Sequence, residues 1–123
     1  MEAGAGEVRH ADDEVRSSLA QVRTALEEDR ARAEQALAKS EALLRQSGNG
    51  HSWDEILFRE EEPRLIELLT DSIQTLMQAS SRLRRAEAQV LHRNGITMER
   101  IADLFGVSRQ RVSHLLKAEP DDV

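Results

Sequence analysis

The apolar positions along the chain follow the spacing of helices. Leucine, isoleucine, valine and alanine recur every three or four residues through residues 12–47 and again through residues 63–92. This interval places apolar side chains on one side of a helix, where they can be buried together. Proline occurs only at Pro63 and Pro120, so little else would interrupt a helix. The pattern therefore predicts an all-α protein.

Both long segments show heptad spacing. In the first, the larger apolar residues are separated by 4, 3 and 4 residues, as in a coiled coil, and then by an interval of 11 that is typical of a local stutter. One narrow apolar stripe on a helix about 50 Å long requires a partner helix, from the same chain or from a second copy. The residues predicted to pair are Val15, Leu19, Val22, Leu26, Leu37 and Leu44 in the first segment and Leu69, Leu76 and Leu83 in the second.

Composition excludes several classes of protein. Aromatic residues make up only 2% of the chain and cysteine is absent, which excludes a large aromatic core, disulfides, thiolate metal sites and cysteine nucleophiles. The four histidines are scattered, without the spacing of metal ligands or of a catalytic triad. We therefore expect a protein that is not an enzyme and that needs no metal or cofactor. Apolar runs are too short for a membrane span or a signal peptide, which predicts a cytoplasmic location.

The charge is distributed unevenly. The net charge of -6 conceals 9 basic and 17 acidic side chains in residues 1–80, a balance of -8, against 8 basic and 3 acidic in residues 81–118, a balance of +5. Three further acids lie in residues 119–123. A basic segment that follows a longer acidic one is where a polyanion would be held. The asymmetry therefore directs attention to residues 81–118.

That basic segment contains two short helices joined by a turn. In residues 96–117, Thr97 and Ser108 are of types that cap the N-termini of helices, and Gly106 suits a tight left-handed turn between them. Two such helices docked on the preceding helix make a helix-turn-helix. The side chains predicted to face inward are Ile101, Ala102, Phe105, Val107, Val112, Leu115 and Leu116.

The side chains left facing outward on the last helix and at its cap can all donate hydrogen bonds, and none of them is acidic. The second helix of a helix-turn-helix enters the major groove of DNA, where arginine reads guanine and glutamine reads adenine. Serine beside the free N–H groups at a helix start suits a phosphate. The predicted DNA-binding residues are Thr97, Ser108, Arg109, Gln110, Arg111, Ser113, His114 and Lys117.

The run IADLFGVSRQRV resembles the helix-turn-helix superfamily of bacterial DNA-binding regulators, especially the forms similar to region 4 of sigma factors and to the C-terminal domain of resolvases. The resemblance covers residues 81–118. It implies binding to double-stranded DNA, and it implies base contacts by Ser108, Arg109, Gln110, Ser113 and His114.

Turn-forming residues divide the rest of the chain. The run from Ser47 to Gly50 ends the first helix, and Ser52 with Glu55 is typical of a capping box that opens a second. We expect the apolar residues that follow, from Trp53 to Phe58, to pack in a core and the acidic run Glu60–Glu62 to lie in solvent. The predicted parts are a disordered arm (1–11), a coiled-coil dimerisation helix (12–47), a central helical region (52–80), the helix-turn-helix domain (81–118) and an acidic tail (119–123).

The function predicted from these parts is sequence-specific binding of double-stranded DNA by a homodimer, as in a bacterial transcriptional regulator of the cytoplasm or nucleoid. One helix-turn-helix offers few base contacts, and pairing doubles them. An intramolecular antiparallel bundle is the alternative to pairing between chains, and parallel and antiparallel dimers both stay open. Two other functions remain as alternatives. One is a nucleoid-associated protein that bridges DNA with low sequence specificity, and the other is an adaptor that binds RNA polymerase or a sigma factor through residues 1–80.

Overall fold

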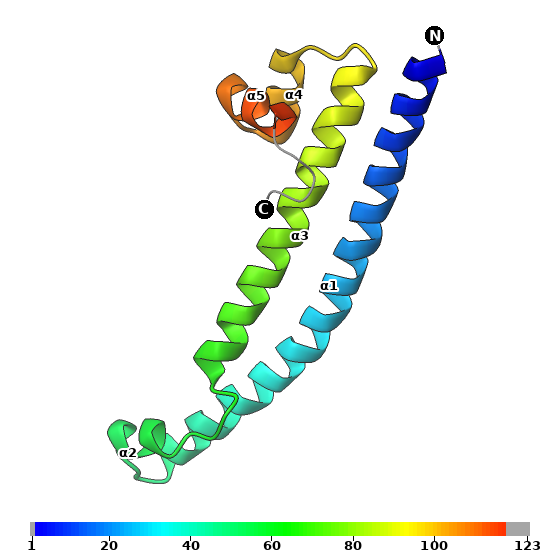
Figure 1. The fold of residues 1–123 in the computed structure, drawn as a ribbon. Coiled ribbons are helices and arrows are strands. Elements are labelled where there is room, and N and C mark those ends of the chain that lie inside the picture. The colour runs from blue at the N-terminus through cyan, green and yellow to red at the C-terminus, as the bar shows by residue number, and fades with distance from the viewer. Residues whose placement is uncertain (1, 118–123) are drawn as a thin grey trace. The chain divides into compact units, whose positions relative to one another are not determined.

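The protein is all-α, as predicted. The computed structural model describes the backbone of residues 2–117 and the side chains of residues 10–117, and this part of the chain contains no strand. The helices, shown in Figure 1, are α1 (Glu2–Gly48), α2 (Trp53–Phe58), α3 (Leu65–Arg93), α4 (Met98–Phe105) and α5 (Arg109–Lys117). They form two compact units, which we call the terminal unit (residues 1–24 with 77–123) and the hairpin unit (residues 25–76).

Helix α1 begins earlier than predicted. It starts at Glu2 rather than at Asp12, so residues 2–11, for which we expected a disordered arm, are helical. Ala11 is buried, which gives the helix a packed residue ahead of the predicted start and so favours its extension. The predicted acidic tail, residues 119–123, lies outside the described residues.

In the terminal unit, the first part of α1 lies beside the last part of α3 (Figure 1). The buried residues on α1 are Ala11 and Ser18, seven residues apart, and those on α3 include Ala79 and Ala86, also seven apart. Small side chains at heptad spacing allow two helices to approach closely. This pair of helices is therefore joined through small residues rather than through leucines.

In the hairpin unit, the second part of α1 runs antiparallel to the first part of α3. Arg32 Nη1 donates a hydrogen bond to Ser72 Oγ at 3.3 Å. Nearer the turn, Lys39 Nζ donates to the Glu61 carbonyl oxygen at 2.6 Å and lies 3.8 Å from Glu60 Oε2. The same Glu60 oxygen accepts the Leu65 N–H at 2.6 Å and so caps α3. The expectation that this acidic run is wholly solvated is therefore wrong for Glu60, which joins α1 to the start of α3.

The heptad leucines are not the residues that pair α1 with α3 within the chain. The buried positions of the hairpin unit include Ala25, Ala36 and Leu68, and the leucines of α1 lie about a quarter turn away from them at about 100° per residue. Helix α1 thus carries two apolar stripes, a buried one of small side chains and an exposed one of leucines. The sequence pattern did not distinguish between them. Of the residues predicted to pair, Leu19, Leu26, Leu37, Leu44 and Leu69 are exposed, whereas Val15, Val22, Leu76 and Leu83 are half-buried.

Helix α2 differs from its prediction in two ways. Only Ile56 is buried in it, while Trp53 and Leu57 are about half exposed and Phe58 is 85% exposed, so core packing is wrong for all but Ile56. The capping box also fails, because the Ser52 side chain makes no cap hydrogen bond. That side chain instead hydrogen-bonds the Asp54 carboxylate and lowers the pKa of Asp54.

Candidate nucleic-acid interface

The helix-turn-helix is held by a small core shared by three helices. Ala88 of α3, Ile101 and Ala102 of α4, and Val112 and Leu115 of α5 are buried together. Phe105, Val107 and Leu116, also predicted to face inward, pack against them, as do Leu91, Ile96 and Met98. The predicted inward set is confirmed. Ala88 was missed because it lies off the heptad positions of α3, and its only sequence signal is its place one helical turn before Leu91.

Caps at the ends of α4 and α5 fix the turn between them. Thr97 Oγ1 accepts the Arg100 N–H at 3.2 Å, and Ser108 Oγ accepts the Arg111 N–H at 3.0 Å. Gly106 adopts the left-handed conformation, with φ 67° and ψ 35°. The Val107 N–H then reaches back to the Ala102 carbonyl oxygen at 3.0 Å, as in a Schellman motif. Both predicted caps and the glycine turn are confirmed.

Helix α5 presents a polar stripe opposite its buried side. Gln110, Ser113, His114 and Lys117 follow one another at intervals of three, one and three residues, which places them on the side away from Val112 and Leu115. All are exposed except Ser113, which is half-buried. The stripe lies along α5 as a row of hydrogen-bond donors and acceptors that another molecule can reach.

Two arginines flank this stripe at the first turn of α5. Arg109 and Arg111 are exposed and lie on opposite sides of Gln110, each about 100° from it. Helix α5 contains no acidic residue, whereas the exposed Glu99 and Asp103 lie on α4. The net positive charge of the two short helices is thus carried by α5, because the single arginine of α4, Arg100, is outnumbered there by these two acids.

The start of α5 is also suited to an anion. The first N–H groups of a helix have no partner within it, and they carry the positive end of the helix dipole. Ser108 is exposed, and its oxygen accepts the Arg111 N–H, so its hydroxyl proton can be donated outward. Thr97 is exposed as well, but it lies at the start of α4, where its oxygen caps that helix.

Comparison with known families identifies this segment. Residues 79–119 match the family of homeodomain-like domains. This segment is a helix-turn-helix domain. The match covers about a third of the chain, and no curated protein and no solved structure matches the sequence. In homeodomains the third helix of the unit reads the major groove. The corresponding helix of this domain is α5, and the domain therefore indicates DNA binding.

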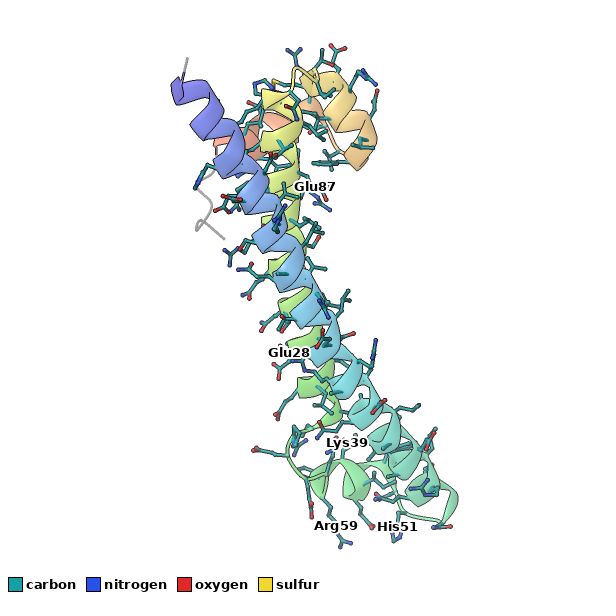
Figure 2. All side chains as sticks on the ribbon, turned by 90° about the vertical axis from the view of Figure 1, so that its right-hand side faces the viewer. Glu28, Lys39, His51, Arg59 and Glu87 are labelled. Atoms are coloured by element: carbon teal, nitrogen blue, oxygen red, sulfur yellow. The ribbon has the colours of Figure 1, made fainter. Side chains whose placement is uncertain are left out.

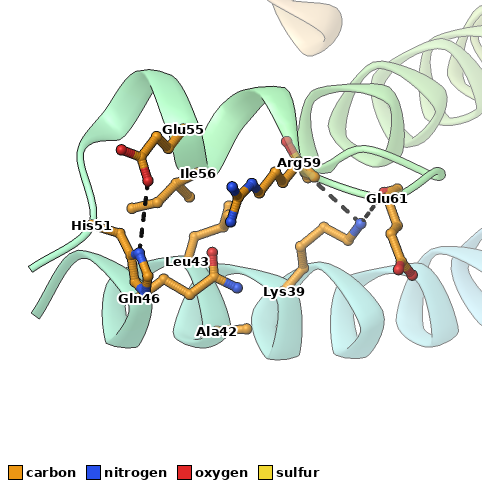
Figure 3. A pocket seen from close by; sticks show the side chains of 10 residues that line it. Lys39, Ala42, Leu43, Gln46, His51, Glu55, Ile56, Arg59 and Glu61 are labelled. Atoms are coloured by element: carbon orange, nitrogen blue, oxygen red, sulfur yellow. Dashed lines mark hydrogen bonds and ion pairs between the residues drawn. The ribbon is translucent and has the colours of Figure 1, made fainter. Parts of the chain in front are cut away.

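A groove lies in the hairpin unit, between α1 and α2. Its volume is about 500 Å³, and its lining includes Lys39, His51, Glu55 and Arg59. His51 Nδ1 lies 3.8 Å from Glu55 Oε2, and Lys39 is turned toward Glu61 (Figure 3). Figure 2 shows Lys39, His51 and Arg59 at the same end of the hairpin unit. Most of the charged side chains of the groove are thus paired with one another. Helix α5 is therefore the better candidate for binding a polyanion.

Among the described residues, no group of three or more histidine, cysteine or acidic side chains is arranged to hold a metal ion. No helix in that same part of the chain is both long and apolar enough to cross a membrane.

Proposed function

We propose that this protein binds double-stranded DNA sequence-specifically as a homodimer and acts as a bacterial transcriptional regulator in the nucleoid. It would be a binding protein rather than an enzyme. The proposal rests on the helix-turn-helix domain at residues 79–119. The DNA-binding residues are inferred from the side-chain types and the exposure of α5. The dimer is inferred from the exposed leucines of α1.

The observation that carries the proposal is the outer surface of α5. Gln110 lies in the exposed stripe between Arg109 and Arg111, so three side chains able to read base edges or hold phosphates stand at the helix start. Lys117 lies at the far end of the same helix. We assign base reading to Arg109 and Gln110, and phosphate contacts to Ser108, Arg111 and Lys117.

Pairing of two chains is supported by the exposed leucines of α1. A soluble monomer rarely leaves a row of large apolar side chains in water, and such rows mark interaction surfaces. A dimer would also present two copies of α5 to two half-sites, which raises both affinity and specificity. The half-buried Val15, Val22, Leu76 and Leu83 serve the packing within each chain instead.

The experiment compares specific with random DNA. A preferred site is first selected from a random duplex library, and affinities for that site and for random duplex are then measured at several salt concentrations. Arg109→Ala should cost roughly 1–3 kcal/mol on the preferred site and much less on random duplex. Lys117→Ala should weaken both about equally and lower the salt dependence by about one phosphate contact. Arg59→Ala, which removes an exposed arginine outside the helix-turn-helix domain, is the control and should change neither.

The outcomes separate the proposal from its alternatives. Equal losses for Arg109→Ala on both duplexes would contradict base reading and favour a DNA-bridging protein of low specificity. Absence of binding to any duplex would contradict the proposal altogether. An adaptor that binds RNA polymerase or a sigma factor would then be tested by capture of those proteins on the full chain.

A further inference from the structure

The exposed leucines of α1 are spaced symmetrically along the sequence of the helix. Leu19, Leu26, Leu37 and Leu44 are separated by 7, 11 and 7 residues, and at about 100° per residue all four lie within about 20° of one line. Leu26 is 53% exposed and Leu37 61% exposed. Because the intervals read the same in both directions, turning α1 end for end about the point between Ala31 and Arg32 exchanges Leu26 with Leu37 and Leu19 with Leu44.

From this symmetry we infer that a second copy of the chain covers the row in an antiparallel orientation, with the twofold axis crossing α1 between Ala31 and Arg32. The inference rests on the homodimer proposed above and adds its geometry. A twofold axis makes each contact occur twice, once on each copy. A palindromic spacing is what such an axis requires of a helix that pairs with itself.

Charge favours antiparallel over parallel pairing. Arg30 is exposed and lies between Leu26 and Leu37 on the same side of α1. In a parallel pair Arg30 would face Arg30 of the second copy, and like charges placed opposite one another are destabilising. In the antiparallel pair the aliphatic part of Arg30 lies over Ala33 of the second copy. The next residue of that copy is the exposed Glu34, which the guanidinium of Arg30 can reach. The antiparallel arrangement thus replaces a repulsion with two ion pairs.

Helix α3 extends the same apolar face. Its exposed Ile66, Leu69 and Ile73 lie about a third of a turn from its buried residues, in the same rotational sense as the leucines of α1, which in an antiparallel hairpin places both rows on one side. The hydrogen bond from Arg32 to Ser72 shows which part of α3 lies beside the centre of the row on α1. The twofold axis therefore passes α3 at the level of Ser72 and Ile73. Leu69 then comes level with Leu76, and Ile73 lies about one residue from level with its own copy.

The opposite side of the hairpin is polar, which leaves one face for the second copy. The exposed residues there include Glu28 and Gln35 on α1 and Glu67, Asp71 and Gln74 on α3. On the other side, the hairpin unit alone supplies several hundred Å² of apolar surface, most of the roughly 800 Å² that each partner buries in a standard interface. This surface comes from six large apolar side chains that are each about half exposed or more, namely Leu26, Leu37, Leu44, Ile66, Leu69 and Ile73. Two hairpins stacked face to face would form a four-helix bundle.

The absence of cysteine allows a direct test with single-cysteine variants of the full chain. Leu26→Cys and Leu37→Cys chains, tagged to differ in size, are oxidised separately and after mixing. The mixture should give a disulfide-linked heterodimer, because a disulfide needs Cα atoms within about 7 Å. Leu26→Cys alone should not link to itself, since the two copies would lie 11 residues, or about 16 Å, apart. Gln35→Cys, on the polar side of α1, is the control and should not link in any combination.

A second measurement covers the case in which a leucine substitution weakens the dimer. Spin labels on Glu41→Cys, which keeps every leucine, should lie about 28 Å apart along α1 in the antiparallel pair, whereas a parallel pair would hold them near the helix spacing of about 8–10 Å. Self-linking of Leu26→Cys or the short label distance would overturn the antiparallel orientation but leave the homodimer. A monomer by light scattering at every concentration would overturn the dimer itself. Neither result depends on DNA binding, which is measured separately.

Discussion

Replacing Gly106 tests whether the turn of the helix-turn-helix depends on backbone conformation alone. Its φ of 67° and ψ of 35° lie in the left-handed region, where an L-residue costs about 1–2 kcal/mol. A Cβ built on Gly106 meets no atom within 4 Å, so no steric term adds to this cost. Gly106→Ala should therefore lower the free energy of unfolding by about 1–2 kcal/mol, and Gly106→Asn by less, because asparagine tolerates this conformation better.

The assay is urea denaturation followed by circular dichroism, with the melting temperature as a second readout. A loss of 1–2 kcal/mol in a chain of this size corresponds to a fall of several degrees in Tm. Gly48→Ala is the matched control, because Gly48 ends α1 and its added Cβ also meets nothing within 4 Å. That change should be neutral or stabilising by up to about 1 kcal/mol. The reasoning fails if Gly106→Ala is neutral, or if alanine and asparagine at position 106 behave alike.

Three more changes have definite expected outcomes. Ile101→Ala empties a fully buried position in the core of the helix-turn-helix and should cost about 2–5 kcal/mol in a denaturant titration, against under about 1.5 kcal/mol for Ile101→Val; similar costs would mean that the site collapses around the gap. Leu26→Asp should yield a monomer in sedimentation experiments, while Gln35→Asp on the polar side should not; a dimeric Leu26→Asp protein would contradict the proposed interface. His114→Glu should weaken binding to DNA in an affinity titration, because it places a negative charge on the exposed polar stripe of α5; an unchanged affinity would place position 114 away from the DNA.

The helix-turn-helix could be predicted almost residue by residue because its signals are local. A cap residue, a left-handed glycine and an apolar residue at helical spacing each determine structure within a few positions. Thr97 and Ser108 therefore cap their helices as predicted, and Gly106 forms the predicted left-handed turn. The exposure of the polar residues of α5 could be predicted as well, because Val112 and Leu115 define the buried side of the helix and the polar residues lie opposite.

The packing of the long helices was harder to predict because heptad spacing does not tell which apolar stripe faces which partner. Large leucines dominate the pattern, yet the close contact within the chain uses Ala25 and Ala36, whose size lets the backbones approach. The role of Glu60 was missed for a related reason, since its two partners, Lys39 and Leu65, come together only when the hairpin closes. Such features depend on contacts distant in sequence.

The continuity of α3 restricts how the DNA-binding element can be exchanged between proteins. This helix runs unbroken from Leu65 to Arg93 and contributes Leu68 to the packing of the hairpin unit, and Ala79 and Ala86 to the packing against α1 in the terminal unit. One residue inserted between these positions would turn every later side chain by about 100°, whereas seven would bring them back to within about 20°. A recombined gene would therefore keep both sets of apolar contacts in phase only when its junction in α3 changes the length by whole heptads.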